Sequence, residues 1–130
     1  MEEQTSFFDQ IGGRETVEKL VNIFYNYMDQ LPEVITIRRQ HQQDLSEARW
    51  KLTLFLTGWL GGPQEYTARF GHPRLRARHL PFPIGINERD QWLLCMFKAI
   101  EDVSEIQEPV RSALQNSLAR LADHMRNQPE

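Results

Sequence analysis

Hydrophobic residues recur at helical spacing along most of this 130-residue sequence. From Thr16 to Met28 the apolar positions advance in steps of three and four residues, which predicts an amphipathic helix. The same spacing recurs from Leu45 to Trp59, from Trp92 to Val103 and from Pro109 to Met125, so four long helices are predicted. No segment shows sustained strand alternation, and the pattern therefore predicts an all-α chain. The inward positions of the first helix are Val17, Leu20, Val21, Phe24, Tyr25 and Met28.

Glycine and proline separate the long helical segments. Paired glycines at 12–13 and 61–62 permit sharp breaks, and Leu31-Pro32 ends the first long helix. Asn87 is expected to cap the third long helix, and residues 127–130 are expected to fray. Shorter helical pieces are predicted between the breaks, over residues 6–10, within 33–43 (followed by a loop) and over 64–70.

The composition is that of one ordinary globular domain, spanning residues 1–130, with 40% hydrophobic and 25% charged residues. A net charge of −3 without a basic tract argues against a nucleic-acid partner. The N-terminus lacks the features of a signal peptide, and no apolar run approaches membrane-spanning length, so no membrane association is expected. Cys95 cannot form an intrachain disulfide, and in its apolar run it is expected to be a buried thiol of a cytoplasmic protein.

Candidate chemistry centres on residues 71–92, where a short helix is predicted between Pro73 and Pro81. Pro73 suits the first turn of that helix, and the ring of Pro81 disfavours helical geometry at Leu80. His79 is therefore expected at the helix C-terminus, where one ring nitrogen can donate to a carbonyl of the final turn. Such a bond makes the other nitrogen a better metal ligand. On chemistry alone, a lone histidine beside apolar residues is more often a structural residue than a metal ligand.

The same stretch carries a resemblance to a known family. Gly-His-Pro-Arg-Leu-Arg-x-Arg-His-x-Pro-Phe, followed by Glu-Arg-Asp-x-Trp, closely resembles the group II truncated haemoglobins. The resemblance implies a two-over-two helical sandwich around haem b, with His79 as the proximal iron ligand and Trp92 overhanging the iron. The paired glycines also match the family's glycine breaks. The resemblance covers essentially the whole chain and is weakest from residue 31 to 43 and after residue 103.

A haem site needs an apolar slot, an axial ligand and charge partners for two propionates. The resemblance implies propionate contacts for Lys51 and Arg78, assisted by Tyr66 and His72. The Arg78 guanidinium can pair with a carboxylate beside His79, whereas Lys51 is nearly as well explained as a solvated helix lysine. Candidates for the slot, which plain core packing would also explain, are Leu45, Leu52, Phe55, Leu56, Phe82, Ile84, Trp92 and Met96.

On the distal side, the resemblance places the family's distal tyrosine at Tyr25 and its characteristic tryptophan at Trp92. Their O–H and N–H groups can donate to a ligand that becomes negatively charged on binding. Ala48 stands where the usual distal histidine would be, and the next inward turn carries Leu52. His41 has two open interpretations. It either reaches the pocket, where its charge would matter near neutral pH, or lies in a surface loop.

These expectations describe a haem protein that binds O2, CO or NO. Two distal donors would slow O2 release, which fits nitric oxide or peroxide detoxification better than bulk delivery. Because no sequence feature supplies a reductase, turnover would need a separate reductase partner, and the enzyme question stays open. One alternative is a cofactor-free helical interaction module. Another is a non-haem metal site from His41, His72 and His79, which lacks a carboxylate at ligand spacing.

Overall fold

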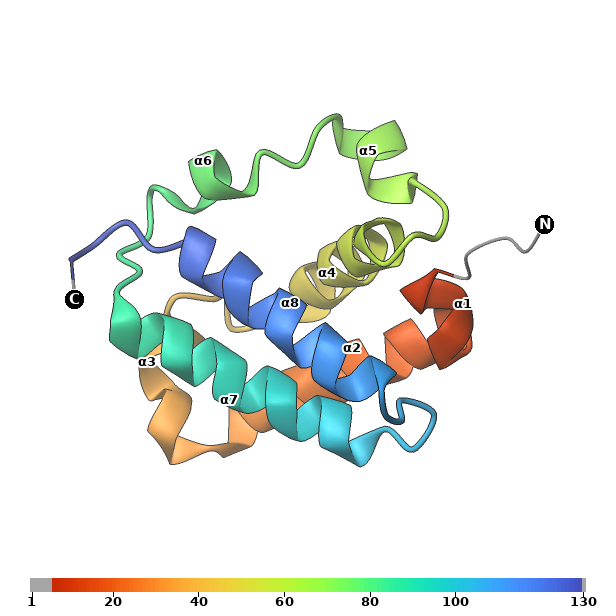
Figure 1. Cartoon of the computed structure of the whole chain (residues 1–130). Coiled ribbons are helices and arrows are strands. Elements are labelled where there is room, and N and C mark those ends of the chain that lie inside the picture. The colour runs from red at the N-terminus through yellow and green to blue at the C-terminus, as the bar shows by residue number, and fades with distance from the viewer. Residues whose placement is uncertain (1–5, 130) are drawn as a thin grey trace.

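Four long helices form the body of the molecule in the computed structural model, which describes residues 6–129. Helix α2 packs against α4 and α7, and α7 packs against α8, with α7 and α8 running in opposite directions (Figure 1). The described residues contain no strand, so the predicted all-α class is confirmed. The long helices are α2 (Arg14–Gln30), α4 (Ser46–Trp59), α7 (Ile86–Asp102) and α8 (Val110–His124).

Short helices connect the long ones at the places where the sequence predicts them. The glycine pair at 61–62 separates α4 from α5, and Gly61 adopts a φ of 102°, which only glycine adopts readily. Proline at position 32 opens a single 3₁₀ turn after α2. The short elements are α1 (Phe7–Ile11), η1 (Pro32–Val34), α3 (Ile35–Arg39), α5 (Glu65–Phe70) and α6 (Leu75–His79).

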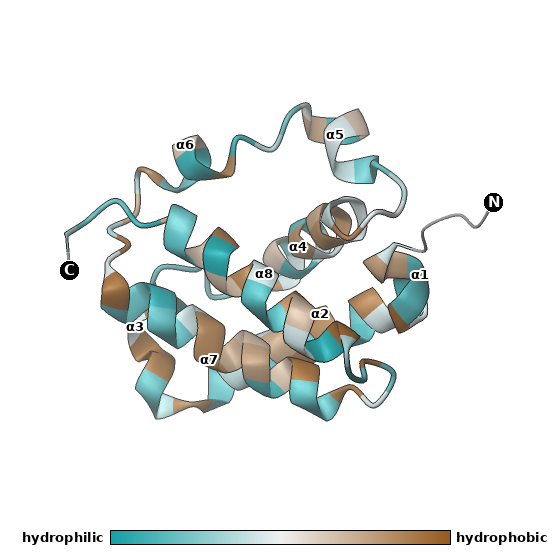
Figure 2. Cartoon of the chain, in the orientation of Figure 1, coloured by the Kyte–Doolittle hydropathy of each residue, from teal (hydrophilic) through white to brown (hydrophobic). Residues whose placement is uncertain are grey.

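The core confirms the predicted inward face of α2. Every position on that face is at most 5% exposed, and full burial of one such aliphatic side chain contributes about 1.5–3 kcal/mol. From α7 the core receives Met96, Ala99 and Ile100. It also receives Cys95, whose pKa burial raises to about 11, so this thiol is a packing residue as expected. Figure 2 shows the hydrophobic stretch of α7 in the middle of the bundle, in contrast to the largely hydrophilic α6.

Two helix starts differ from the prediction. Helix α7 begins at Ile86, and the Gly85 N–H donates to the Glu88 carboxylate at 2.7 Å. Asn87 is therefore already inside the helix and is not its cap, because a glutamate at the third helical position reaches back to the uncapped N–H instead. Pro73 likewise precedes α6, which begins at Leu75.

The prediction of fraying after α8 is also wrong for Asn127 and Gln128, and Glu130 lies outside the described residues. Asn127 makes side-chain and backbone hydrogen bonds to the segment between α6 and α7. These partners are more than 40 positions away in the sequence, so helical periodicity holds no information about them.

Within residues 6–129, no helix is long and apolar enough to cross a membrane.

The start of α7 gives a direct stability test. Glu88→Ala should lower the free energy of unfolding by about 1 kcal/mol, because it removes the acceptor of the Gly85 N–H. Glu88→Gln should retain most of that stability, since its amide oxygen can accept the same bond. Asn87→Ala is the matched control and should change stability by less than about 0.5 kcal/mol. Urea unfolding followed by circular dichroism measures all three. A larger loss for Asn87→Ala than for Glu88→Ala would contradict the assignment of the cap.

Candidate functional site

A cavity of about 530 Å³ lies between the wall formed by α2, α3 and α4 and the wall formed by α6, α7 and α8. Its volume falls in the range of about 300–1,000 Å³ that is usual for cofactor and small-molecule sites. Most of its lining is apolar. The cavity brings together many of the predicted site residues, namely Tyr25, His41, Ala48, Lys51, Leu52, Phe55, His79, Phe82, Ile84 and Trp92.

His79 is the last residue of α6, and its ring contributes to the cavity wall. Its Nδ1 lies 2.6 Å from the carbonyl oxygen of Leu75, one turn earlier. A carbonyl can only accept, so in the neutral ring Nδ1 carries the hydrogen and Nε2 keeps its lone pair. This is the bond that the sequence predicts for a histidine at the end of this helix. It produces the tautomer that a metal ligand needs.

His41 also lines the cavity, and its ring is held in the same way. Its Nδ1 lies 2.8 Å from the carbonyl oxygen of Ile37, so its Nε2 also keeps a lone pair in the neutral ring. Burial lowers the pKa of His41, the hydrogen bond to the Ile37 carbonyl oxygen opposes this shift in part, and the positive charge of Arg38 adds to it. The neutral form of His41 is therefore favoured. In this form Nε2 can accept a hydrogen bond but cannot donate one.

Tyr25 and Trp92 bring hydrogen-bond donors to the same cavity. Burial raises the pKa of the Tyr25 hydroxyl, which keeps its proton, and the side chain is only 5% exposed. The hydroxyl is 3.5 Å from the Ala48 carbonyl oxygen, at the limit of a hydrogen bond, so a better acceptor would compete easily. Among residues 6–129 the Trp92 indole N–H has no recorded hydrogen-bond partner. Both rings pack against Phe24, with centroids 4.9 Å and 5.3 Å away.

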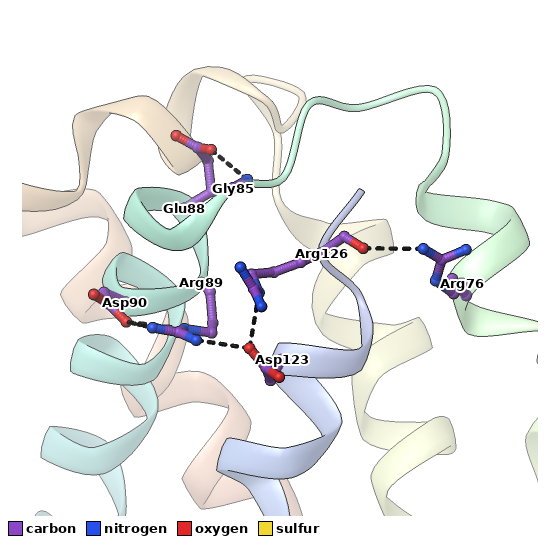
Figure 3. A network of polar contacts seen from close by, with 7 residues as sticks. All are labelled: Arg76, Gly85, Glu88, Arg89, Asp90, Asp123 and Arg126. Atoms are coloured by element: carbon purple, nitrogen blue, oxygen red, sulfur yellow. Dashed lines mark hydrogen bonds and ion pairs between the residues drawn. The ribbon is translucent and has the colours of Figure 1, made fainter. Parts of the chain in front are cut away.

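Two cations lie on the cavity lining. Lys51 pairs with Glu47 at 2.9 Å, and its ammonium is 5.5 Å from the Phe70 ring centroid. Arg89, in the first turns of α7, pairs with Asp123 of α8 at 2.6 Å (Figure 3). Both cations are already paired with carboxylates of the protein. Each can still present its positive charge to an anionic group at the edge of the cavity.

Four of the predicted cofactor contacts lie outside this lining. The Arg78 guanidinium stacks 5.7 Å from the Tyr66 ring centroid, and its Nη2 donates to the Phe70 carbonyl oxygen at 3.4 Å. His72 is exposed, and its Nδ1 accepts from the backbone N–H of Arg74 at 3.1 Å. Met96 is completely buried in the core one turn beyond Trp92. Of the other slot candidates, Leu45 and Leu56 are likewise buried in the core.

The sequence does not single out the part of the wall that comes from α3 and α8. Ile37 and Gln40 line the cavity from α3 and its end, and Leu121, Ala122 and Met125 line it from α8 and its end. Helical spacing places Leu121 and Met125 on an inward face, yet the same spacing describes core and cavity walls alike. For Arg89, the available signal is its position inside the Glu-Arg-Asp-x-Trp motif, which by itself indicates the family and not a cavity contact.

The donor set fits a metal that brings its own ligands. Among residues 6–129 no group of three or more His, Cys, Asp or Glu side chains is placed to hold a metal ion. A lone imidazole with a free Nε2, an apolar slot and cations at the edge suit an iron porphyrin, which supplies four equatorial nitrogens and two carboxylates. The non-haem site from His41, His72 and His79 has no support, because His72 is exposed and outside the cavity lining.

Comparison with known proteins agrees with this fit. The family model for bacterial-like globins matches residues 6–127. The group 2 truncated hemoglobin YjbI of Bacillus subtilis is 42% identical over 118 residues, which cover 91% of this chain and 86% of the relative. The group II 2-on-2 hemoglobin of Agrobacterium tumefaciens superposes with a TM-score of 0.92 at 43% identity, covering 98% of both chains. The group II truncated hemoglobin of Bacillus anthracis gives 0.90 at 40% identity, covering 99% of this chain and 96% of the other. The chain therefore belongs to the bacterial-like globin family, among the group II truncated haemoglobins whose two-over-two fold it shares.

Proposed function

We propose that this globin holds haem b in the 530 Å³ cavity through His79 and binds O2, CO and NO there. Haem-based binding of small ligands follows from the family. One observation supports the proposal above all others. The His79 imidazole, tied through Nδ1 to the Leu75 carbonyl, and two uncharged hydrogen-bond donors, Tyr25 and Trp92, line the same largely apolar cavity.

The lining divides into groups with different tasks in this proposal. Apolar side chains, among them Leu52, Phe55, Phe82 and Ile84, would contact the porphyrin faces and exclude water. Lys51 would pair with a propionate, as the family resemblance implies. Arg89 is a further candidate for that task, because it carries a charge on the cavity lining.

The remaining predicted contacts stand outside the lining. Three of them would act only at the margin of the site, on propionates that extend beyond the cavity, namely Arg78, Tyr66 and His72. Met96 would support Trp92 from the core.

Bound haem supplies an iron that takes up diatomic gases and exchanges electrons. The Tyr25 hydroxyl and the Trp92 indole would donate to a ligand that becomes negatively charged, and would thereby slow its release. Ala48 leaves space on α4 in front of Tyr25. Neutral His41 would offer Nε2 as an acceptor and so would not donate to the ligand itself.

Slow release of O2 is the functional consequence of two donors in one cavity. A protein that releases O2 slowly delivers it poorly and is better suited to consuming nitric oxide or peroxide. We propose this redox role, with electrons from a separate reductase, in the cytoplasm, where a single buried thiol such as Cys95 stays reduced. The alternative of a cofactor-free interaction module would leave the cavity and its oriented imidazole without a task.

The iron ligand is tested by substitution. His79→Ala should lose haem or hold it loosely. The other histidine on the cavity lining, His41, belongs to the opposite wall and cannot take the place of His79 on α6. His72→Ala and His124→Ala, both at exposed positions, should keep the wild-type absorption spectrum. Absorption spectra of the purified ferrous proteins measure the outcome. A wild-type ferrous spectrum in His79→Ala, without added imidazole, would refute the assignment.

The two distal donors are tested by gas release. A hydrogen bond to a charged group contributes about 1.5–3 kcal/mol, and each 1.36 kcal/mol is about a factor of ten in rate. Trp92→Phe and Tyr25→Phe should therefore each speed O2 release roughly tenfold to a hundredfold. CO carries far less charge when bound, so its release should change much less. Stopped-flow measurements compare the two gases. Equal acceleration for both would show that the side chains block the exit path instead.

His41 should give the O2 dissociation rate a pH dependence of known sign. Its pKa lies below 6.5, so it is neutral at pH 7 and gains a proton as the solution becomes more acidic. Protonation turns Nε2 into a donor, and O2 release should slow as the pH falls below 6.5.

Because folding favours the neutral ring, the stability that His41 contributes is present above pH 6.5 and declines as the pH falls through the pKa of the folded state.

Stopped-flow measurements between pH 5 and 8 follow this dependence. His41→Phe should abolish it, and His124→Ala, which removes an exposed histidine, should leave it intact. An unchanged titration in His41→Phe would assign the effect to another group.

A further inference from the structure

Helix α6 carries the proposed iron ligand but has little packing of its own. It is five residues long, and none of its residues is buried. Figure 1 shows it in the long connection between α5 and α7, and Figure 2 shows that its surface is mostly hydrophilic. Such a short helix is not stable by itself. The position of His79 must therefore be fixed by contacts from other parts of the chain.

The segment after α8 provides these contacts at the C-terminal end of α6. The Asn127 side-chain amide donates to the Phe82 carbonyl oxygen at 2.8 Å and to the His79 carbonyl oxygen at 3.3 Å. Its side-chain oxygen accepts from the Ile84 N–H at 3.0 Å. The backbone N–H groups of Asn127 and Gln128 both donate to the Ile84 carbonyl oxygen, at 2.9 Å and 3.2 Å. One residue thus uses every polar group of its side chain on the segment that follows His79.

The sequence of that segment explains why it needs an outside partner. Pro81 and Pro83 have no N–H, so residues 80–84 cannot satisfy their own carbonyls by continuing a helix. Buried or partly buried backbone groups nearly always find a partner. Asn127 offers two donors and an acceptor oxygen at the required spacing.

The same segment also reaches the body of α6. Arg76 Nη2 donates to the Arg126 carbonyl oxygen at 3.2 Å (Figure 3). Arg126 Nε in turn pairs with Asp123 at 2.8 Å, and Asp123 pairs with Arg89 of α7 at 2.6 Å. Residues 126–128 are therefore joined to α6 on one side and, through Asp123, to α7 and α8 on the other.

We propose that residues 126–128 form a C-terminal clasp that sets the position of His79 in the cavity, with Asn127 as its positioning residue. The proposal rests on the proposed function, since it assumes that His79 is the iron ligand. Asn127 is not part of the cavity lining formed by the described residues, so it acts through the backbone at His79 and Phe82. The clasp orients the imidazole from the backbone side, while the Leu75 carbonyl orients it from the ring side.

The test measures the iron–histidine bond directly. Haem-loaded Asn127→Ala should show a shifted iron–histidine stretching band in the ferrous, ligand-free protein, recorded by resonance Raman spectroscopy. Its haem should also transfer to a haem-free acceptor globin faster, by roughly threefold to thirtyfold, because several hydrogen bonds that fix the ligand are lost. Asn127→Asp keeps the shape and the acceptor for the Ile84 N–H but removes the donor to both carbonyls, and it should shift the band in the same sense. Asn116→Ala removes an exposed carboxamide of α8 that lies outside both the clasp and the cavity lining, and it is the matched control that should leave band and transfer rate unchanged.

A second background separates positioning from general stability. In His79→Gly supplied with free imidazole, the iron ligand is no longer attached to α6. There, adding Asn127→Ala should have no effect on the iron–imidazole band or on haem transfer. An equal acceleration in both backgrounds would overturn the clasp as a positioning device. A wild-type band and transfer rate in Asn127→Ala would also overturn it, while loss of the band in His79→Gly without imidazole would still support the ligand assignment.

Discussion

The hydrogen bond from His79 Nδ1 to the Leu75 carbonyl oxygen is the interaction on which the site depends. It selects the tautomer, and it ties the ring to the final turn of a helix with no buried residue. The quality of this one bond therefore depends on what holds α6 in place. In most helical proteins a ligand-bearing helix is anchored by its own apolar face. Here hydrogen bonds between residues 126–128, α6 and the segment after α6 take that part.

Two polar side chains inside the largely apolar cavity are uncharged. Burial lowers the pKa of His41 and raises that of Tyr25, so one is a neutral ring and the other a neutral hydroxyl at pH 7. His41 and His79 share the same bond from Nδ1 to a carbonyl one turn earlier, so both present an acceptor nitrogen. The donors come instead from Tyr25 and Trp92. This separation leaves one imidazole to act as a ligand, whereas the other can only assist a donor until it is protonated.

Helix content and the approximate helix limits could be predicted from the sequence because they follow from local periodicity. The inward face of α2 is an example, since every predicted position is buried. The bond of His79 was predictable too, because it involves a residue four positions away and a proline that ends the helix. The role of Asn127 was not, because its partners lie more than 40 residues away. Arg78 and Arg89 show a related limit: adjacency to His79 favoured Arg78, yet Arg89 lies on the cavity lining and Arg78 stacks on Tyr66.

Helix α8 shows how closely the core and the site are connected. Leu114 and Leu118 pack in the core, while Leu121 and Met125, further along the same helix, line the cavity. A cavity with apolar walls exposes surface that the hydrophobic effect favours burying. A ligand that fills it binds the folded state only and therefore stabilises that state by mass action. The segment after Met125 also holds α6. A ligand that fills the cavity would therefore stabilise both the part of the wall that α8 forms and the helix that carries His79. We therefore infer that uptake of the cofactor and ordering of α6 are thermodynamically coupled.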